Sequence, residues 1–96
     1  MNKPFSQACE NNKLPILALL TNALSKSKSV LEVGSGTGQH AVYFAPHMTW
    51  LSWQTSDMLL NHQGISQWLQ EYPAGNLLYP IELDLNHPWP IEKVDA

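Results

Sequence analysis

A short apolar strand that runs directly into a glycine-rich loop is the feature that most constrains how this chain folds. Residues 29–40 read SVLEVGSGTGQH, with Gly34, Gly36 and Gly38 at every second position of the loop. Because glycine has no Cβ, such a loop adopts positive φ angles cheaply and lets a small molecule contact the main chain. A helix that follows would point free N–H groups at the same place. The run therefore predicts a strand, loop and helix that bind a nucleotide-like cofactor.

The spacing of the glycines argues against two phosphate-binding motifs. The dinucleotide fingerprint G-x-G-x-x-G needs its third glycine at position 39, where this chain has Gln39. The P-loop needs Gly-Lys-Ser/Thr, and no lysine lies between Ser29 and the expected helix. What remains is Glu32 two positions before a G-x-G-x-G run. This pattern resembles the first motif of the Rossmann-like methyltransferases, which implies S-adenosylmethionine as the cofactor. A nicotinamide-binding domain is an alternative that Gln39 disfavours.

Composition limits the class of protein and its partners. The 96 residues, of which 44% are hydrophobic, are typical of one globular domain spanning residues 1–96. A net charge of −3, with five lysines and arginines scattered singly, gives no basic patch, so we expect no nucleic-acid partner. The apolar run at residues 14–20 contains Pro15 and is far shorter than the ~20 residues that span a bilayer. Without a signal-peptide core at residues 1–4 and beyond, we expect a cytoplasmic protein with no membrane partner.

Metal binding and disulfide formation receive no support from the sequence. Cys9 is the single cysteine, so neither an intrachain disulfide nor a cysteine metal cluster can form. The four histidines, at positions 40, 47, 62 and 87, have no metal-ligand spacing. We expect no metal site.

The periodicity of apolar residues predicts alternating helices and strands. Expected helices are one starting at Asn12, a short one at residues 40–45 stopped by Pro46, and one carrying Ile65, Trp68, Leu69 and Tyr72. Expected strands cover residues 30–33, 49–55 and 77–85, the last containing Pro80 and therefore favouring a sheet edge. This order implies right-handed βαβ units and a parallel sheet. Trp50, Trp53 and Trp68 are expected in the core.

Almost the full length resembles the methyltransferase-like protein 26 family, small Rossmann-type proteins inferred to use S-adenosylmethionine. The matching positions are Ser6, Ala8, Glu10, Asn12, Pro15 to Leu17, Val30 to Phe44, Trp53 to Asp57, Gly64-Ile65, Trp68-Leu69, Leu83-Asp84 and Trp89-Pro90. The resemblance implies a partial Rossmann-like methyltransferase fold in the α/β class, with three parallel strands in the order 3-2-1 and flanking helices. Asn11 departs from the family, which usually has arginine there.

The candidate cofactor-binding residues follow from the motif and the resemblance; they are Glu32, Gly34, Ser35, Gly36, Gly38, Asp57 and Asp84. A carboxylate inside an apolar strand is costly unless something pairs with it, and in the resembling superfamily the acid at Glu32 faces the amino end of the methionine moiety. Asp57 lies about 20 positions after the glycines, the spacing at which Rossmann folds place a carboxylate on ribose hydroxyls. A helix N-cap for residues 58–60 is the alternative role for Asp57.

Other candidates keep two interpretations each. Asp84 resembles the acid that recognises the adenine amino group, and an Asx turn explains it nearly as well. Gln39 and His40 open the helix after the glycines, where a cofactor or a substrate would lie. Glu10 and Asn12 match an N-terminal motif that either folds back over the cofactor or simply starts a helix. No catalytic residue is assigned, because transfer of a methyl group from a sulfonium demands alignment and exclusion of water rather than an acid–base dyad.

The last residues shape the expectation for the chain as a whole. Residues 94–96 resemble the opening of a fourth strand, so we expect the chain to carry the N-terminal part of the domain without the C-terminal half of the sheet. The segment that lines the acceptor site in relatives belongs to that half, so the acceptor substrate stays unknown and the chain alone is expected to be inactive. The alternative is a non-catalytic interaction module that self-associates through the exposed edge of strand 30–33.

Overall fold

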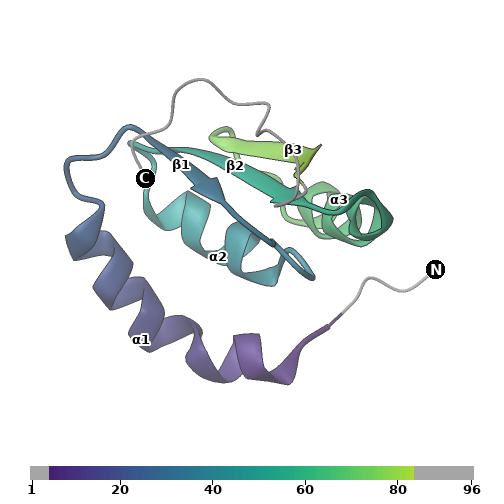
Figure 1. Ribbon diagram of the computed structural model, residues 1–96. Helices are drawn as coiled ribbons and strands as arrows, with labels where there is room; N and C mark the ends of the chain where they lie inside the picture. Colours follow the sequence, from purple (N-terminus) through teal and green to yellow (C-terminus); the bar gives the residue numbers. More distant parts are fainter. Residues whose placement is uncertain (1–4, 84–96) are drawn as a thin grey trace.

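A computed structural model describes residues 5–83 of the chain as an α/β fold built on three parallel strands (Figure 1). The first two strands are each followed by a connection that leads into a helix. In chain order the elements are α1 (Gln7–Ala23), β1 (Ser29–Glu32), α2 (Gln39–His47), β2 (Ser52–Asp57), the 3₁₀ helix η1 (Leu59–Asn61), α3 (His62–Glu71) and β3 (Leu77–Glu82).

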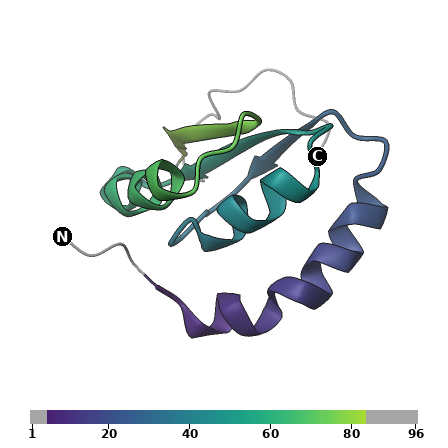
Figure 2. The ribbon, with the colours of Figure 1, turned by 180° about the vertical axis from the view of Figure 1, so that it is seen from behind.

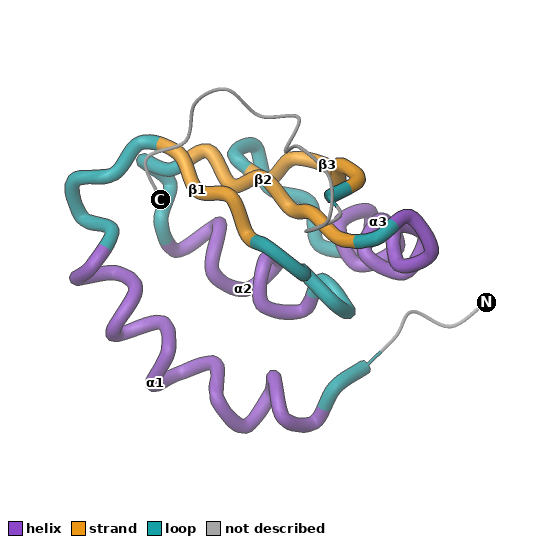
Figure 3. The backbone as a smooth tube through the Cα atoms, viewed as in Figure 1, coloured by secondary structure: helices purple, strands orange, loops and turns teal. Residues whose placement is uncertain are grey.

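The strands lie in the order β1-β2-β3, with β2 in the middle, and both pairs are parallel (Figure 3). Helices α2 and α3 cover one face of the sheet, and α1 lies outside α2 on the same side (Figures 1 and 2). This confirms the predicted partial Rossmann-like arrangement of three parallel strands in the order 3-2-1 with flanking helices.

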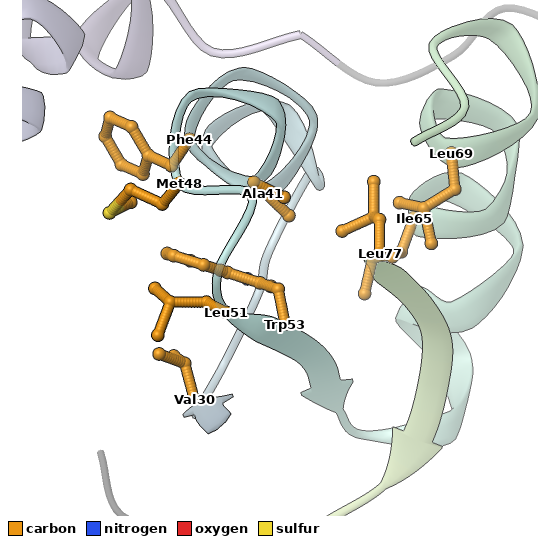
Figure 4. Packing of buried hydrophobic residues seen from close by; sticks show 10 residues of the cluster. Val30, Ala41, Phe44, Met48, Leu51, Trp53, Ile65, Leu69 and Leu77 are labelled. Atoms are coloured by element: carbon orange, nitrogen blue, oxygen red, sulfur yellow. The ribbon is translucent and has the colours of Figure 1, made fainter. Parts of the chain in front are cut away.

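The core lies between the sheet and α2 and α3, and it consists of two adjoining groups of side chains (Figure 4). Trp53 of β2 is the centre of the first group, where Phe44 of α2 lies with its ring centroid 6.0 Å from that of Trp53. Ile65 of α3 and Leu77 of β3 belong to the second group. Burial of these side chains is the main stabilising term, at about 1.5–3 kcal/mol for each large apolar side chain. The core therefore fixes α2 and α3 firmly on the sheet.

Two of the three tryptophans expected in the core are buried there, and the third is not. Trp53 and Trp68 expose 3% and 7% of their surface, whereas Trp50 exposes 43%. Trp50 precedes β2 in a turn, and its indole N–H donates to the carbonyl of Leu24 at 2.9 Å. The prediction was wrong for Trp50 because it took an aromatic cluster next to a strand as part of that strand.

Helix α1 begins at Gln7, five positions before the predicted start at Asn12. Ser6 is the N-cap residue, and its hydroxyl accepts a hydrogen bond from the backbone N–H of Cys9 at 3.3 Å. Pro15 therefore lies in the middle of the helix rather than in its first turn. Proline removes one backbone hydrogen bond at that point, yet α1 is one continuous helix; we call the residues before Pro15 its first half and the residues after it its second half.

Helix α2 continues through Pro46 to His47, beyond the predicted stop at Ala45. A proline in the last turn removes a single backbone hydrogen bond. The helix end is satisfied from elsewhere, because the side-chain amide of Asn76 donates to the carbonyls of Ala45 at 2.8 Å and Met48 at 3.1 Å.

Strand β2 starts later and ends later than predicted, so that Ser56 and Asp57 belong to the strand rather than to a turn. In β3, the register places Leu78 opposite Gln54 and Ile81 opposite Ser56. Two residues of β3, one of them Pro80, therefore face a single residue of β2, which is a bulge that accommodates proline. Within residues 5–83, β3 is an edge strand, as Pro80 predicted. Across this same described stretch, none of the helices combines the length and the apolar character needed to cross a bilayer.

Candidate functional site

The glycine loop joins the carboxyl end of β1 to the start of α2. Gly34, Gly36 and Gly38 have φ angles of +69°, +62° and +91°, which confirms the predicted left-handed conformation of the loop. A Cβ on Gly36 would meet one atom within 4 Å, the carbonyl oxygen of Gly34 at 4.0 Å. A Cβ on Gly38 would instead lie 3.3 Å from the Cα of Ile65. Gly36 therefore leaves the outer surface of the loop open, and Gly38 lets α3 approach closely.

Two buried serines fasten the loop to the neighbouring strand. The N–H of Ser35 donates to the carbonyl of Ser56 at 2.7 Å, and the N–H of Ser56 donates to the hydroxyl of Ser35 at 3.0 Å. The hydroxyl of Ser56 in turn donates to the carbonyl of Glu32 at 2.6 Å. Ser35, predicted as a cofactor contact, thus has a structural part in holding the loop against β2.

Asp57, the last residue of β2, connects the strand to the loop through its carboxylate. One carboxylate oxygen accepts from the N–H of Gly36 at 2.8 Å, and the other accepts from the N–H of Met58 at 2.7 Å and the amide of Asn61 at 2.9 Å. Burial by itself raises the pKa of Asp57, but the hydrogen bonds from Asn61, Gly36 and Met58 together bring that pKa below its ordinary value. Helix η1 has no side-chain cap, so the capping role for Asp57 is not what the structure shows.

Glu32 ends β1 in the interior of the site. Burial raises the pKa of its carboxyl group above the ordinary value, although hydrogen bonds from Ser35 and Trp53 favour the ionised form. The indole N–H of Trp53 donates to the carboxylate at 3.3 Å. The Nε2 atom of His40 is buried and has no hydrogen-bond partner among residues 5–83. A positive charge on the His40 ring would also favour the ionised form of Glu32. A cationic group placed beside Glu32 would stabilise the carboxylate that burial disfavours.

Gln39, the first residue of α2, holds the N-terminal segment against the glycine loop. Its side chain is 3% exposed, and its amide nitrogen donates to the carbonyl of Ser6 and to the carboxylate of Glu10, both at 3.1 Å. Its amide oxygen accepts from the N–H of Ser6. We refer to Gln39, Ser6 and Glu10 as the glutamine latch. Glu10 thus lies in the first turn of α1 and contacts Gln39 at the start of α2, whereas Asn12 is exposed.

Sequence reasoning missed this role of Gln39, since it counted the residue mainly as the departure from the dinucleotide fingerprint. The signal was a glutamine in the first turn of a helix that packs on the sheet. A long polar side chain at such a position needs partners when it is buried. Those partners come from a segment about 30 residues earlier in the chain, which no local pattern reveals.

The structure brings most of the predicted site residues together at the carboxyl ends of β1 and β2. In open α/β sheets this is the edge at which ligands bind. The site there comprises Glu32, Gly34, Ser35, Gly36, Gly38 and Asp57. Asp84 lies outside the described residues. The described part of the chain contains no cluster of three or more histidine, cysteine, aspartate or glutamate side chains suited to a metal ion.

These features define a class of protein: an α/β chain with a parallel sheet, a strand–glycine loop–helix unit, and two carboxylates at the ligand-binding edge of the sheet. Within that class, residues 3–96 match the family described as protein of unknown function (DUF938). The chain belongs to that family.

Proposed function

We propose that this chain is the S-adenosylmethionine-binding part of a methyltransferase-like protein that transfers a methyl group to an acceptor yet to be identified. The observation that carries the proposal is the pairing of an open glycine loop with Glu32, a half-buried carboxylate at the end of β1 whose pKa is raised by desolvation. We also propose that the chain is related to the methyltransferase-like protein 26 family, whose motifs it resembles.

The residues present fit the chemistry of that cofactor. S-adenosylmethionine carries an ammonium group and a sulfonium, and Glu32 is a half-buried carboxylate that a cation would stabilise. The ribose presents two neighbouring hydroxyls, which suit a carboxylate acceptor such as Asp57. The cofactor has no phosphate, which agrees with a loop that lacks lysine. When bound, the sulfonium would supply an activated methyl group.

The residues of this chain would bind and orient rather than exchange protons. Glu32 would hold the cationic end, and Gly36 would let the ligand approach the main chain because no side chain covers it. Asp57 keeps the loop in register with β2 through its bond to Gly36. With the hydrogen bonds from Gly36, Met58 and Asn61 retained, Asp57 has one lone-pair site left for a ribose hydroxyl, on the oxygen that accepts from Gly36.

The proposal is tested by nuclear magnetic resonance titration of the 96-residue chain with S-adenosylmethionine and S-adenosylhomocysteine. This method detects weak complexes as saturable shifts of the Gly34, Gly36 and Asp57 amides. Glu32→Gln should weaken binding of S-adenosylmethionine by about ten- to hundredfold, because it removes a charged partner worth about 1.5–3 kcal/mol. Glu82→Gln, at the exposed end of β3, is the matched control and should leave the affinity unchanged.

Two results would contradict the proposal. One is the absence of saturable shifts in the loop at millimolar ligand, and the other is equal binding by Glu32→Gln and Glu82→Gln. Nicotinamide adenine dinucleotide serves as the competing ligand. If it displaces S-adenosylmethionine at lower concentration, the alternative of a nicotinamide-binding domain replaces the proposal.

A second candidate function is a non-catalytic module that self-associates through β1. The observation in its favour is that β1, within residues 5–83, pairs with β2 alone, so one edge of this strand carries no ladder partner among those residues. Sedimentation velocity over a range of concentrations tests it. A dimer that forms with rising concentration supports this function, and a monomer at all concentrations refutes it.

A further inference from the structure

A cavity separate from the open surface of the glycine loop lies beneath the first half of α1. It has a volume of about 380 Å³ and adjoins α2 and α3. Half of its lining residues are aromatic, namely Phe5, Tyr43, Trp68 and Tyr72, and the lining also includes Glu10 and Lys13. Small-molecule sites have volumes of about 300–1,000 Å³ and combine apolar walls with a few polar groups. The cavity has the size and the lining of such a site.

The cavity exists because of how α1 is held. None of the residues of α1 is buried, and its second half packs on the core through partly buried side chains such as Ile16, Leu17 and Leu20. The first half is instead attached by the glutamine latch, a set of hydrogen bonds that fixes its end without filling the space below. The roof of the cavity is therefore a half-helix held by Gln39 at one end and bounded by Pro15 at the other.

The walls favour a flat aromatic guest. Trp68 and Tyr72 stack with their ring centroids 5.6 Å apart and their planes 25° from parallel, and both residues line the cavity. Phe5 keeps 61% of its surface exposed and Tyr72 keeps 46%. A planar ring placed between these walls would gain stacking contacts and remove apolar surface from water.

The polar groups favour a guest that is neutral and donates a hydrogen bond. The ammonium of Lys13 is already paired with the carboxylate of Glu10 at 2.9 Å and lies 4.7 Å from the centre of the Tyr43 ring. The lining therefore has no net charge to attract an ion. Among residues 5–83, each carboxylate oxygen of Glu10 accepts one hydrogen bond, from Lys13 or from Gln39, which leaves a lone pair on each for a further donor.

We infer that this cavity is a second binding site, which takes a neutral planar aromatic molecule carrying an N–H or O–H donor. The inference does not depend on the cofactor proposed for the glycine loop. Its probes are indole, which has the ring and the donor, 1-methylindole, which lacks the donor, and cyclohexanol, which lacks the aromatic ring.

Titration of the 96-residue chain with each probe, followed by nuclear magnetic resonance, tests the inference. Indole should give saturable shifts at the side-chain amide of Gln39 and the backbone of Tyr72, and 1-methylindole and cyclohexanol should bind more weakly. Phe5→Ser and Tyr72→Ser should each weaken indole binding by about two- to tenfold, the range for loss of one aromatic contact. Tyr79→Ser, at a similarly exposed tyrosine of β3, is the control and should bind indole like the unaltered chain.

Several outcomes would overturn the inference. One such outcome is the absence of saturable shifts with indole, as expected if residues of the chain itself fill the cavity. Another is a set of shifts confined to Gly36 and Asp57 at the glycine loop. Equal affinity in Phe5→Ser, Tyr72→Ser and Tyr79→Ser, or cyclohexanol binding as well as indole, would do the same. Because S-adenosylmethionine is read at the loop amides and indole at Tyr72, either site can fail without the other.

Discussion

The glutamine latch can be broken by Gln39→Glu, a substitution that keeps the shape of the side chain. The glutamine amide nitrogen donates to the carbonyl of Ser6 and the carboxylate of Glu10. In the variant, a carboxylate oxygen takes the place of that nitrogen. Two attractive contacts then become repulsive, and only the hydrogen bond from the N–H of Ser6 survives.

The magnitude follows from the contacts and the burial of this position. Loss of the hydrogen bond to the Ser6 carbonyl costs about 1 kcal/mol, and burial of a carboxylate whose one remaining donor among residues 5–83 is the backbone N–H of Ser6 raises the total to about 3 kcal/mol. Repulsion by Glu10 acts in the same direction. Since no residue of α1 is buried, we expect the first half of α1 to detach while the core stays folded. A loss of about 3 kcal/mol corresponds to a rise of about a hundredfold in local opening.

Hydrogen exchange measures that opening amide by amide. Residues 10–14 should exchange about a hundredfold faster in Gln39→Glu at neutral pH, whereas the amides of β2 should keep their protection. In acid, protonation of the introduced carboxylate restores a donor, so part of the protection should return. Gln70→Glu, an exposed change of equal charge in α3, is the control. Unchanged exchange at residues 10–14, or an equal loss in β2, would refute the idea that the latch is the main attachment of this half-helix.

Three further predictions concern the loop. Asp57→Asn should lower the free energy of unfolding by about 1–3 kcal/mol at neutral pH. Because the folded pKa of Asp57 is lowered, its stabilisation is present above the unfolded pKa and is lost as pH falls through the folded pKa. In urea unfolding, the difference in free energy between the unaltered chain and Asp57→Asn should therefore shrink in acid. An equal difference at neutral and acid pH would contradict this prediction. Burial raises the folded pKa of Glu32, so its contribution to stability is full below the unfolded pKa and is lost as pH rises through the folded pKa. Glu32→Gln should therefore raise the melting temperature at neutral pH. A lower melting temperature in the variant would count against the raised pKa. Gly38→Ala should lower the free energy of unfolding by about 1–3 kcal/mol, because Gly38 has a φ of +91° and lies close to the Cα of Ile65. Gly75→Ala is the control and should leave the free energy of unfolding nearly unchanged in chemical denaturation. Similar losses in the two variants would show that neither factor matters.

The fold was largely predictable because its signals are local. Alternation between an apolar strand and an amphipathic helix determines the βαβ order, and the glycines mark the turn between β1 and α2. Helix ends were less predictable. Ser6 caps α1 ahead of the expected start at Asn12, and Asn76 satisfies the end of α2 from a distant loop. Boundaries depend on single side-chain contacts, which periodicity does not contain.

The candidate site was predictable in its residue types and less so in their connections. A carboxylate after a strand and glycines in a loop are visible in sequence, and parallel strands bring their ends to one edge. The bond from Gly36 to Asp57 and the serine pair that fastens the loop depend on how β1 and β2 lie side by side. The aromatic cavity was not predicted at all, because Phe5, Tyr43 and Tyr72 come from three separate segments that only the folded chain brings together.

The residue at position 39 links these two regions of the molecule. In the dinucleotide fingerprint a glycine at this position allows a helix to pack closely on a strand. In this chain Gly38 provides the close approach, toward Ile65 of α3, and position 39 is free to carry a side chain. That side chain turns toward the N-terminal segment and binds Ser6 and Glu10. Gln39, the residue that departs from the fingerprint, therefore attaches α1 to the start of α2 beside the glycine loop. Gln39 and its partner Glu10 also line the aromatic cavity.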